Sequence, residues 1–235
     1  MPTPTRFPSG VTNAAKDEPL GNFGLPDPTK WHVWFDDFDN FEADQWVITR
    51  VGTTPTEVTI SGDNGLLLLT MAATDDSSSS LQWSGDDNAA VVETFRFVTG
   101  KQLFFKTRFQ VSDATQSDFV LGLQITDTTP LAVSDGIYFR KDDGDANLDF
   151  VVLKDAAGTT TTAFSTIVAA TFTELAFWYD GKSKIEIFKD GVKLGTSALT
   201  GLPDDEELAI SIHMQNGEAV AKTMTIDYIF VAKER

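Results

Sequence analysis

The sequence predicts an all-β protein in which two antiparallel sheets pack together, or one large barrel closes, behind an extended N-terminal arm. Three observations support this. Apolar and polar side chains alternate along most of the chain after residue 30, Asp-Gly and Asn-Gly pairs separate the alternating stretches, and prolines gather near the N-terminus. Alternation with a period of two is typical of strands that bury one face. More than a dozen such stretches joined by short turns favour a sandwich or a barrel.

Residues 1–30 are predicted to form the arm, and residues 31–235 the folded domain. Six of the nine prolines lie within the first 28 residues. Proline lacks an amide donor and fixes φ, so this stretch cannot form a central strand or a long helix. A terminus without fixed structure is the alternative. We expect the few large apolar residues of the arm, with two tryptophans that follow it, to bind a partner: Phe7, Val11, Leu20, Phe23, Leu25, Trp31 and Trp34.

The folded domain is predicted to consist of strands almost throughout. No segment shows a sustained helical period. The alternation is clearest in residues 103–111, where Leu103 and Phe105 share one face while Phe104 and Lys106 share the other. Predicted strands cover 31–38, 45–51, 56–61, 65–72, 89–98, 103–111, 118–126, 136–141, 147–154, 159–168, 173–180, 183–189, 208–215 and 224–230.

Turn residues and short runs of one residue type lie between or within these predicted strands. Asp190-Gly191 predicts a two-residue hairpin turn, because both positions of such a turn need positive φ. We interpret Ser77 to Ser80 as a loop. Thr159 to Thr162 is interpreted as a solvent-facing edge strand, since threonine favours the pleated backbone.

Charge and composition exclude several classes of protein. The chain has 18 basic and 35 acidic residues and a net charge of −17, which argues against binding to nucleic acid or to anionic membranes. The absence of cysteine excludes disulfides, thiol chemistry and cysteine-based zinc sites. No signal peptide is visible, and the longest aliphatic run, Leu66 to Leu69, is far shorter than the roughly 20 residues that span a bilayer.

One segment offers a weak calcium candidate. Its oxygen ligands at alternate positions resemble the start of a calcium loop, and they are Asp143, Asp145, Asn147 and Asp149. The pattern then fails, because Leu148 stands where the loop needs glycine and Lys154 stands where it needs a bidentate glutamate. A hairpin turn explains these residues better, so we predict no metal site.

Nucleophilic chemistry finds little support. The only histidines are His32 and His213, and we interpret both as structural. His213 shares a strand face with Ser211, but side chains two residues apart rarely form a catalytic pair. No Gly-x-Ser-x-Gly elbow, phosphate loop or dinucleotide fingerprint is present, so we predict no catalytic residue and no cofactor.

Two stretches resemble the concanavalin A-like, or laminin G-like, jelly rolls. Leu175 to Gly195 looks like their strand and hairpin that closes on Asp-Gly, and Met224 to Val231 is similar to their closing strand. The resemblance covers residues 31–235 and implies a two-sheet antiparallel jelly-roll sandwich. Glycoside hydrolases of this superfamily carry Glu-x-Asp-x-(x)-Glu on one strand. Here Glu42-Ala43-Asp44 begins that pattern without a second glutamate, so hydrolysis by this route is not expected.

The N-terminal part is similar to tailed-bacteriophage virion proteins with a laminin G-like body. Arg6 to Lys16, Pro19 to Asp39 and Phe119 to Pro130 carry this resemblance. It implies a non-enzymatic structural protein of the virion, assembled in the host cytoplasm, that decorates or cements the capsid through its arm and body. The implied partners are other virion proteins, above all the major capsid protein, and further copies of this chain, with a trimer favoured.

A carbohydrate-binding module, carried on a virion to touch the host surface, is the alternative function. It predicts exposed Trp or Tyr on a sheet face with Asp and Asn nearby. For the tryptophans we expect core packing or arm docking in preference to a glycan platform. They are Trp31, Trp34, Trp46, Trp83 and Trp178.

Overall fold

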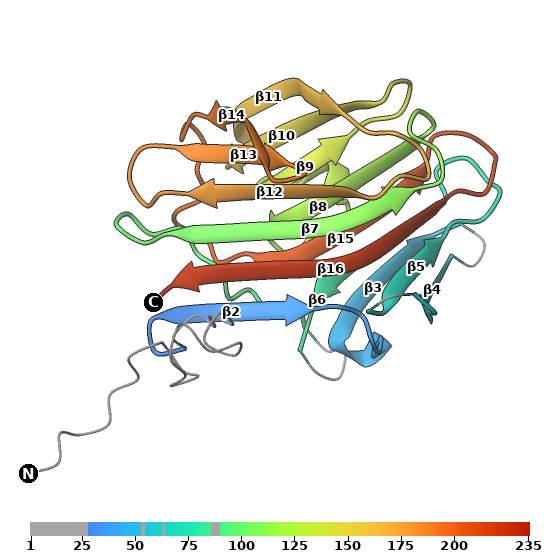
Figure 1. Ribbon diagram of the computed structural model, residues 1–235, viewed down its shortest axis with the longest axis horizontal. Coiled ribbons are helices and arrows are strands. Elements are labelled where there is room, and N and C mark those ends of the chain that lie inside the picture. Colours follow the sequence, from blue (N-terminus) through green and yellow to red (C-terminus); the bar gives the residue numbers. More distant parts are fainter. Residues whose placement is uncertain (1–27, 53–54, 63, 86–89) are drawn as a thin grey trace, which may run out of the picture.

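The computed structural model describes residues 28–52, 55–62, 64–85 and 90–235. These residues form two antiparallel sheets stacked face to face, and their only helical elements are two short 3₁₀ turns. In Figure 1 the strands of the eight-stranded sheet cross the front of the view, and those of the seven-stranded sheet lie behind them. The two-sheet sandwich is confirmed and no barrel closes. Residues 1–27, nearly all of the predicted arm, lie outside the described residues.

The seven-stranded sheet brings together segments from distant parts of the chain. Its central strands β8 and β15 are more than 80 residues apart in the sequence, and they pair in antiparallel register from Ala209–Gln124 to Asn216–Ser117. Its strands run in the order β11 (Ala157–Thr166), β10 (Asn147–Lys154), β9 (Gly136–Lys141), β8 (Ser117–Gln124), β15 (Ala209–Asn216), β6 (Ser78–Trp83) and β3 (Trp46–Val51).

The eight-stranded sheet is centred on the long last strand. This strand pairs along one side with β7, and along the other with β5 in its first part and with β2 (Trp31–Asp36) in its last part. The order of the main path is β14 (Val192–Ser197), β13 (Ile185–Lys189), β12 (Thr173–Tyr179), β7 (Leu103–Val111), β16 (Thr223–Glu234), β5 (Leu66–Thr70) and β4 (Thr56–Ile60).

The core lies between the sheets and is rich in phenylalanine. In β7 the predicted alternation is confirmed, because Leu103 and Phe105 are buried while the intervening side chains are half-buried. Phe105 stacks on Phe177 with ring centroids 5.3 Å apart, and Phe177 lies 6.1 Å from Phe139 of the opposite sheet. Apolar burial of about 25 cal/mol per Å² holds such a sandwich together without covalent cross-links.

Two predicted segments differ from the structure. Ser77 to Ser80 is not a loop, because residues 78–80 begin β6, which lies inside the seven-stranded sheet between β15 and β3. Serine is small enough to be buried on both faces there, and Ser79 and Ser80 find partners in Glu57 and His213. The strand predicted at 89–98 is also wrong, because its described residues make a single isolated bridge from Phe95 to Leu208.

Several turn and edge predictions are confirmed. Asp190 and Gly191 have φ of 50° and 74° between β13 and β14, as the hairpin requires. Thr159 to Thr162 lies in β11 at one edge of its sheet, with an exposed face. Gly122 permits a close approach of strands, because a Cβ there would lie 2.5 Å from the Cα of Tyr138. Among the described residues, no helix has the length and apolarity to cross a membrane.

Candidate functional site

The outer face of the seven-stranded sheet is covered by the loop of residues 125–135. Leu131 and Val133 of this loop pack on Val120, Tyr138 and Val151 of the strands beneath. Polar contacts fix the loop as well, since Gln82 donates to the carbonyl of Ile125 at 2.9 Å and Gln124 donates to that of Pro130 at 2.8 Å. A cavity of about 160 Å³ remains beside the loop. The loop therefore covers the part of this face that β8, β9 and β10 form.

His213 lies on this covered face and is buried. Its Nδ1 is 2.7 Å from the Oγ of Ser80 on the neighbouring strand β6, a partner that sequence reasoning missed because it considered only Ser211. Burial lowers the pKa of His213 to about 4, so the ring is neutral at neutral pH. Ser80 is only 3% exposed, and the hydrogen bonds of His213 within the described residues go to neutral side chains. The pair does not form a catalytic triad.

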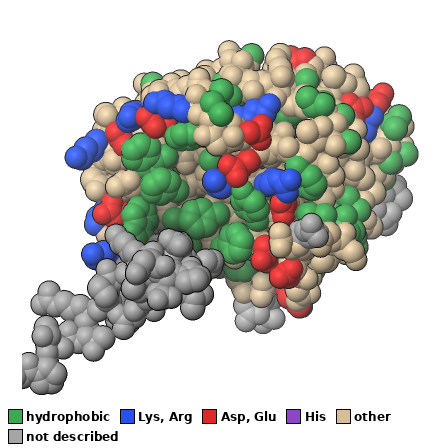
Figure 2. Space-filling view, in the orientation of Figure 1, with side chains coloured by type: hydrophobic (Ala, Val, Ile, Leu, Met, Phe, Trp, Pro, Cys, Tyr) green, Lys and Arg blue, Asp and Glu red, His purple; other side chains and the backbone are tan. Residues whose placement is uncertain are grey.

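The outer face of the eight-stranded sheet carries an apolar groove of about 280 Å³, which we call the aromatic groove. Strand alternation points its side chains away from the core, and the small side chain of Ala176 leaves its centre hollow between Lys106 and Phe188 of the adjacent strands. Figure 2 shows hydrophobic side chains gathered on this face. The groove is lined on its open side by Phe104, Lys106, Glu174, Ala176, Trp178, Phe188 and Phe230.

Phe104 and Trp178 form the flattest part of the groove. The two residues are direct partners across β7 and β12, and their rings lie 5.9 Å apart with an interplanar angle of 12°. The indole Nε1 of Trp178 donates to Gln102 at 3.0 Å, which fixes the orientation of the ring. Trp31 extends the platform, with its ring 5.7 Å from that of Phe104. Further along the face, Phe35 is 56% exposed.

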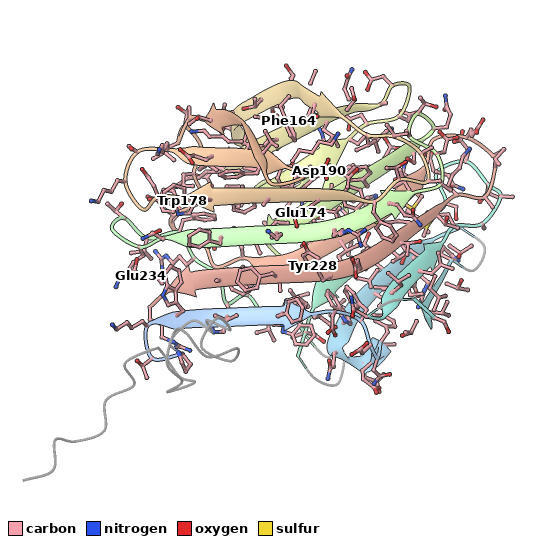
Figure 3. The ribbon with its side chains drawn as sticks, viewed as in Figure 1. Phe164, Glu174, Trp178, Asp190, Tyr228 and Glu234 are labelled. Atoms are coloured by element: carbon pink, nitrogen blue, oxygen red, sulfur yellow. The ribbon has the colours of Figure 1, made fainter. Side chains whose placement is uncertain are left out.

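Charged side chains border the aromatic groove in pairs. Glu174 accepts from Lys106 at 3.1 Å and from the hydroxyl of Tyr228 at 2.5 Å, and Figure 3 shows Glu174 and Tyr228 on neighbouring parts of this face. Burial alone would raise the pKa of Glu174, but the hydrogen bonds from Tyr228 and Lys106 lower it. Burial and the carboxylate of Glu174 raise the pKa of Tyr228. The glutamate is thus ionised and the phenol protonated at neutral pH.

The tryptophans named as partner-binding residues lie in two environments. Trp31 lies beside the aromatic groove. Trp34 points into the sandwich, where its ring centroid is 5.9 Å from that of Trp46 and 5.0 Å from that of Trp83. The other proposed anchors are outside the described residues: Phe7, Val11, Leu20, Phe23 and Leu25.

The calcium candidate residues line one hollow at the turn between β9 and β10, and two of them accept hydrogen bonds from backbone amides. Asp145 accepts from the backbone amide of Asn147 at 2.7 Å, and Asp149 accepts from that of Ala163 at 2.9 Å. Asp143 lies on the same hollow. In the described part of the chain, no group of three acidic or histidine side chains is arranged to hold a metal ion.

The residues of the incomplete hydrolase pattern do not share a strand face. Glu42 and Asp44 belong to the 3₁₀ turn Ala43–Gln45 and its cap, ahead of β3. Two carboxylates that act together on a glycosidic bond must converge on one groove. Sequence reasoning also missed the aromatic groove, although Phe104 on the otherwise polar face of its strand, and Trp178 beside Glu174 and Ala176, could have indicated it.

No family model matches this sequence, and no curated protein sequence matches it. Solved structures do resemble the structure of this chain. An endo-1,3-beta-glucanase from Streptomyces sioyaensis is 13% identical with a TM-score of 0.59, and the alignment covers 88% of this chain and 97% of that one. The fold is a concanavalin A-like jelly roll.

Two further structures share it. An endo-beta-1,4-glucuronan lyase from Trichoderma reesei is 13% identical with a TM-score of 0.57, over 84% of this chain and 94% of that chain. The carbohydrate recognition domain of Emp46p is 9% identical with a TM-score of 0.55, over 83% and 93%. At such identities the likeness shows the fold alone. No virion protein is among the structures named here.

These comparisons correct the prediction that the protein is not an enzyme. That prediction rested on the incomplete hydrolase pattern and on the resemblance to virion proteins. A glucanase and a glucuronan lyase have the same fold, so the fold gives no ground for excluding enzymes. The comparisons favour the alternative function, a carbohydrate-binding jelly roll, over the virion role.

Proposed function

We propose that this protein binds carbohydrate in the aromatic groove. The observation that carries the proposal is the pair of nearly parallel rings of Phe104 and Trp178, which line the groove on the outer face of the eight-stranded sheet. Aromatic rings offer large apolar faces to the C–H faces of sugars, and a few polar groups beside them fix orientation. Glu174, Lys106 and the edge of Tyr228 supply such polar groups.

The dimensions of the face fit an oligosaccharide better than a single sugar. The aromatic side chains run diagonally across the face, because Phe35 of β2 pairs with Phe230 of β16, while Trp178 of β12 pairs with Phe104 of β7, two residues from the partner of Phe230. Neighbouring strands lie about 4.8 Å apart, so three spacings give about 14 Å across the strands. Structures with the same fold include a carbohydrate recognition domain and a glucanase, which supports this class of ligand.

The proposal is tested by replacing the platform rings. Trp178→Ala and Phe104→Ala should each weaken binding of a glucan oligosaccharide by about thirtyfold, since truncating a central aromatic contact costs about 2 kcal/mol. Titration calorimetry measures the affinities. Val168→Ala is the matched control, because Val168 is 62% exposed and is not among the residues that line the groove. Equal affinities in all four proteins would reject the aromatic groove as the binding site.

We also propose a second role, attachment to a phage particle through residues 1–30. The resemblance of the N-terminal part to virion proteins supports this role, and so does the way the arm joins the body. The backbone amide of Arg235 donates to the carbonyl of Lys30 at 2.7 Å, and its guanidinium donates to that of Pro28 at 3.0 Å. The arm therefore leaves from a fixed point beside β2. Its proposed partners are the major capsid protein and further copies of this chain, as a trimer.

A further inference from the structure

We infer that the aromatic groove selects neutral sugars, and that Glu174 is the specificity-determining residue that excludes carboxylated ones. This inference rests on the proposed carbohydrate binding and names its substrate class. The fold does not decide between neutral and carboxylated sugars, since the structures with the same fold include both an endo-1,3-beta-glucanase and an endo-beta-1,4-glucuronan lyase.

Glu174 forms an ion pair with Lys106, the one lysine among the described residues that line the groove. Its Oε1 lies 3.1 Å from the Nζ of Lys106, and its Oε2 accepts from the hydroxyl of Tyr228. The glutamate side chain is 23% exposed and the lysine side chain 44% exposed, so both reach the wall of the groove. An incoming sugar carboxylate that accepts from a free N–H of Lys106 would lie beside the carboxylate of Glu174, and the two like charges would repel each other.

The other cationic side chains near the groove also form ion pairs with carboxylates. Arg108 pairs with Asp227, next to Tyr228. At the other end of the groove, Lys184 lies over the ring of Trp178 and shares Glu186 with Lys193, at 2.5 and 2.6 Å. Each of these cations therefore already has a carboxylate partner.

Charge repulsion adds to this local pairing. The whole chain carries −17, and a carboxylate brought to an uncharged part of its surface meets a repulsive field. Recognition of a carboxylate needs a positive group with free hydrogen-bond donors. A neutral sugar needs no unpaired positive group, because its hydroxyl groups can accept from Lys106 and donate to Glu174 while the ion pair between these two residues stays intact.

The experiment compares two ligands that differ only at C6. A β-1,4-glucan hexasaccharide and the corresponding β-1,4-glucuronan hexasaccharide are each titrated into the full chain. The unmodified protein should bind the neutral hexasaccharide at least about tenfold more tightly. Glu174→Gln removes the carboxylate beside Lys106, so the glucuronan should gain one charge-assisted hydrogen bond from this lysine. At a half-exposed site this should reduce the ratio of the two affinities about tenfold. The double variant Glu174→Gln with Lys106→Gln should restore the ratio.

Glu207→Gln is the matched control, because it removes the same charge from a glutamate that pairs with a cation, Arg96, and neither residue lines the groove. The ratio of the two affinities should stay as in the unmodified protein. Equal binding of both hexasaccharides by the unmodified protein would overturn the inference, as would an equal effect of the two single variants. Binding of neither hexasaccharide would instead reject the proposed function itself.

Discussion

At the scale of single residues, Lys141 shows how a buried charge is held in this sandwich. Its side chain is fully buried at the end of β9, and Nζ donates to the carbonyls of Thr115 at 3.2 Å and Asp142 at 3.0 Å, and to that of Ser117. Burial lowers the pKa of Lys141, while Asp118 and other carboxylates nearby raise it. The ammonium thus joins the segment before β8 to the turn after β9.

Lys141→Met should lower the free energy of unfolding by about 3 kcal/mol. The substitution keeps the volume but takes a hydrogen-bond donor away from three carbonyls and removes a positive charge near Asp118. Chemical denaturation measures the change. Lys182→Met, at an exposed position, serves as control and should change stability by no more than about 0.5 kcal/mol. Equal stability of the two variants would show that the carbonyl contacts of Lys141 contribute nothing.

Asp118 should make stability depend on pH. Burial raises the pKa of Asp118 to about 6 from 3.8. Its stabilising contribution is therefore fully present below pH 3.8 and is lost as the pH rises through about 6, with a total on the order of 3 kcal/mol. Asp118→Asn keeps an acceptor for the backbone amide of Asp143 and cannot titrate. The variant should gain stability relative to the unmodified protein between pH 4 and pH 7, measured by denaturation at each pH. A constant difference would contradict the raised pKa.

At the scale of elements, most strands could be predicted because one face of each is buried. The alternation in β7 locates Phe104 on the solvent face from sequence alone. The strand β6 could not be predicted, because serines buried on both faces leave no alternation, and their partners Glu57 and His213 are distant in the sequence. To predict the aromatic groove, the register of β7 with β12 would have to be known, because this register sets Phe104 beside Trp178. The sequence of neither strand alone determines such a non-local pairing.

The arm is an element whose removal can be tested separately. Deleting residues 1–27 should leave the sandwich folded, because β2 begins at Trp31 and the shortened chain keeps the contacts of Arg235 with Pro28 and Lys30. Thermal unfolding and circular dichroism measure this, and co-sedimentation with phage particles measures attachment. We expect an unchanged melting temperature and lost attachment. Unfolding of the shortened chain would show that the arm belongs to the core.

At the scale of the whole molecule, the sequence predicted the class of fold but not which face of it is functional. The order of strands joins the two ends of the chain, since β2 pairs with β16. The loop of residues 125–135 then covers part of one outer face, while the other carries the aromatic groove. Neither the pairing of β2 with β16 nor the difference between the two outer faces depends on a short sequence motif, so neither could be predicted from one. The acidic net charge acts over the whole surface and favours neutral partners.

The most direct measurement of the central claim is a titration followed by nuclear magnetic resonance. The indole N–H of Trp178 is a single reporter in the aromatic groove, while those of Trp46 and Trp83 report on the core. Adding a β-1,4-glucan hexasaccharide should shift the Trp178 signal to saturation and leave the Trp46 signal in place. A saturable shift confined to residues around the 125–135 loop, or no shift at all, would contradict carbohydrate binding in the aromatic groove.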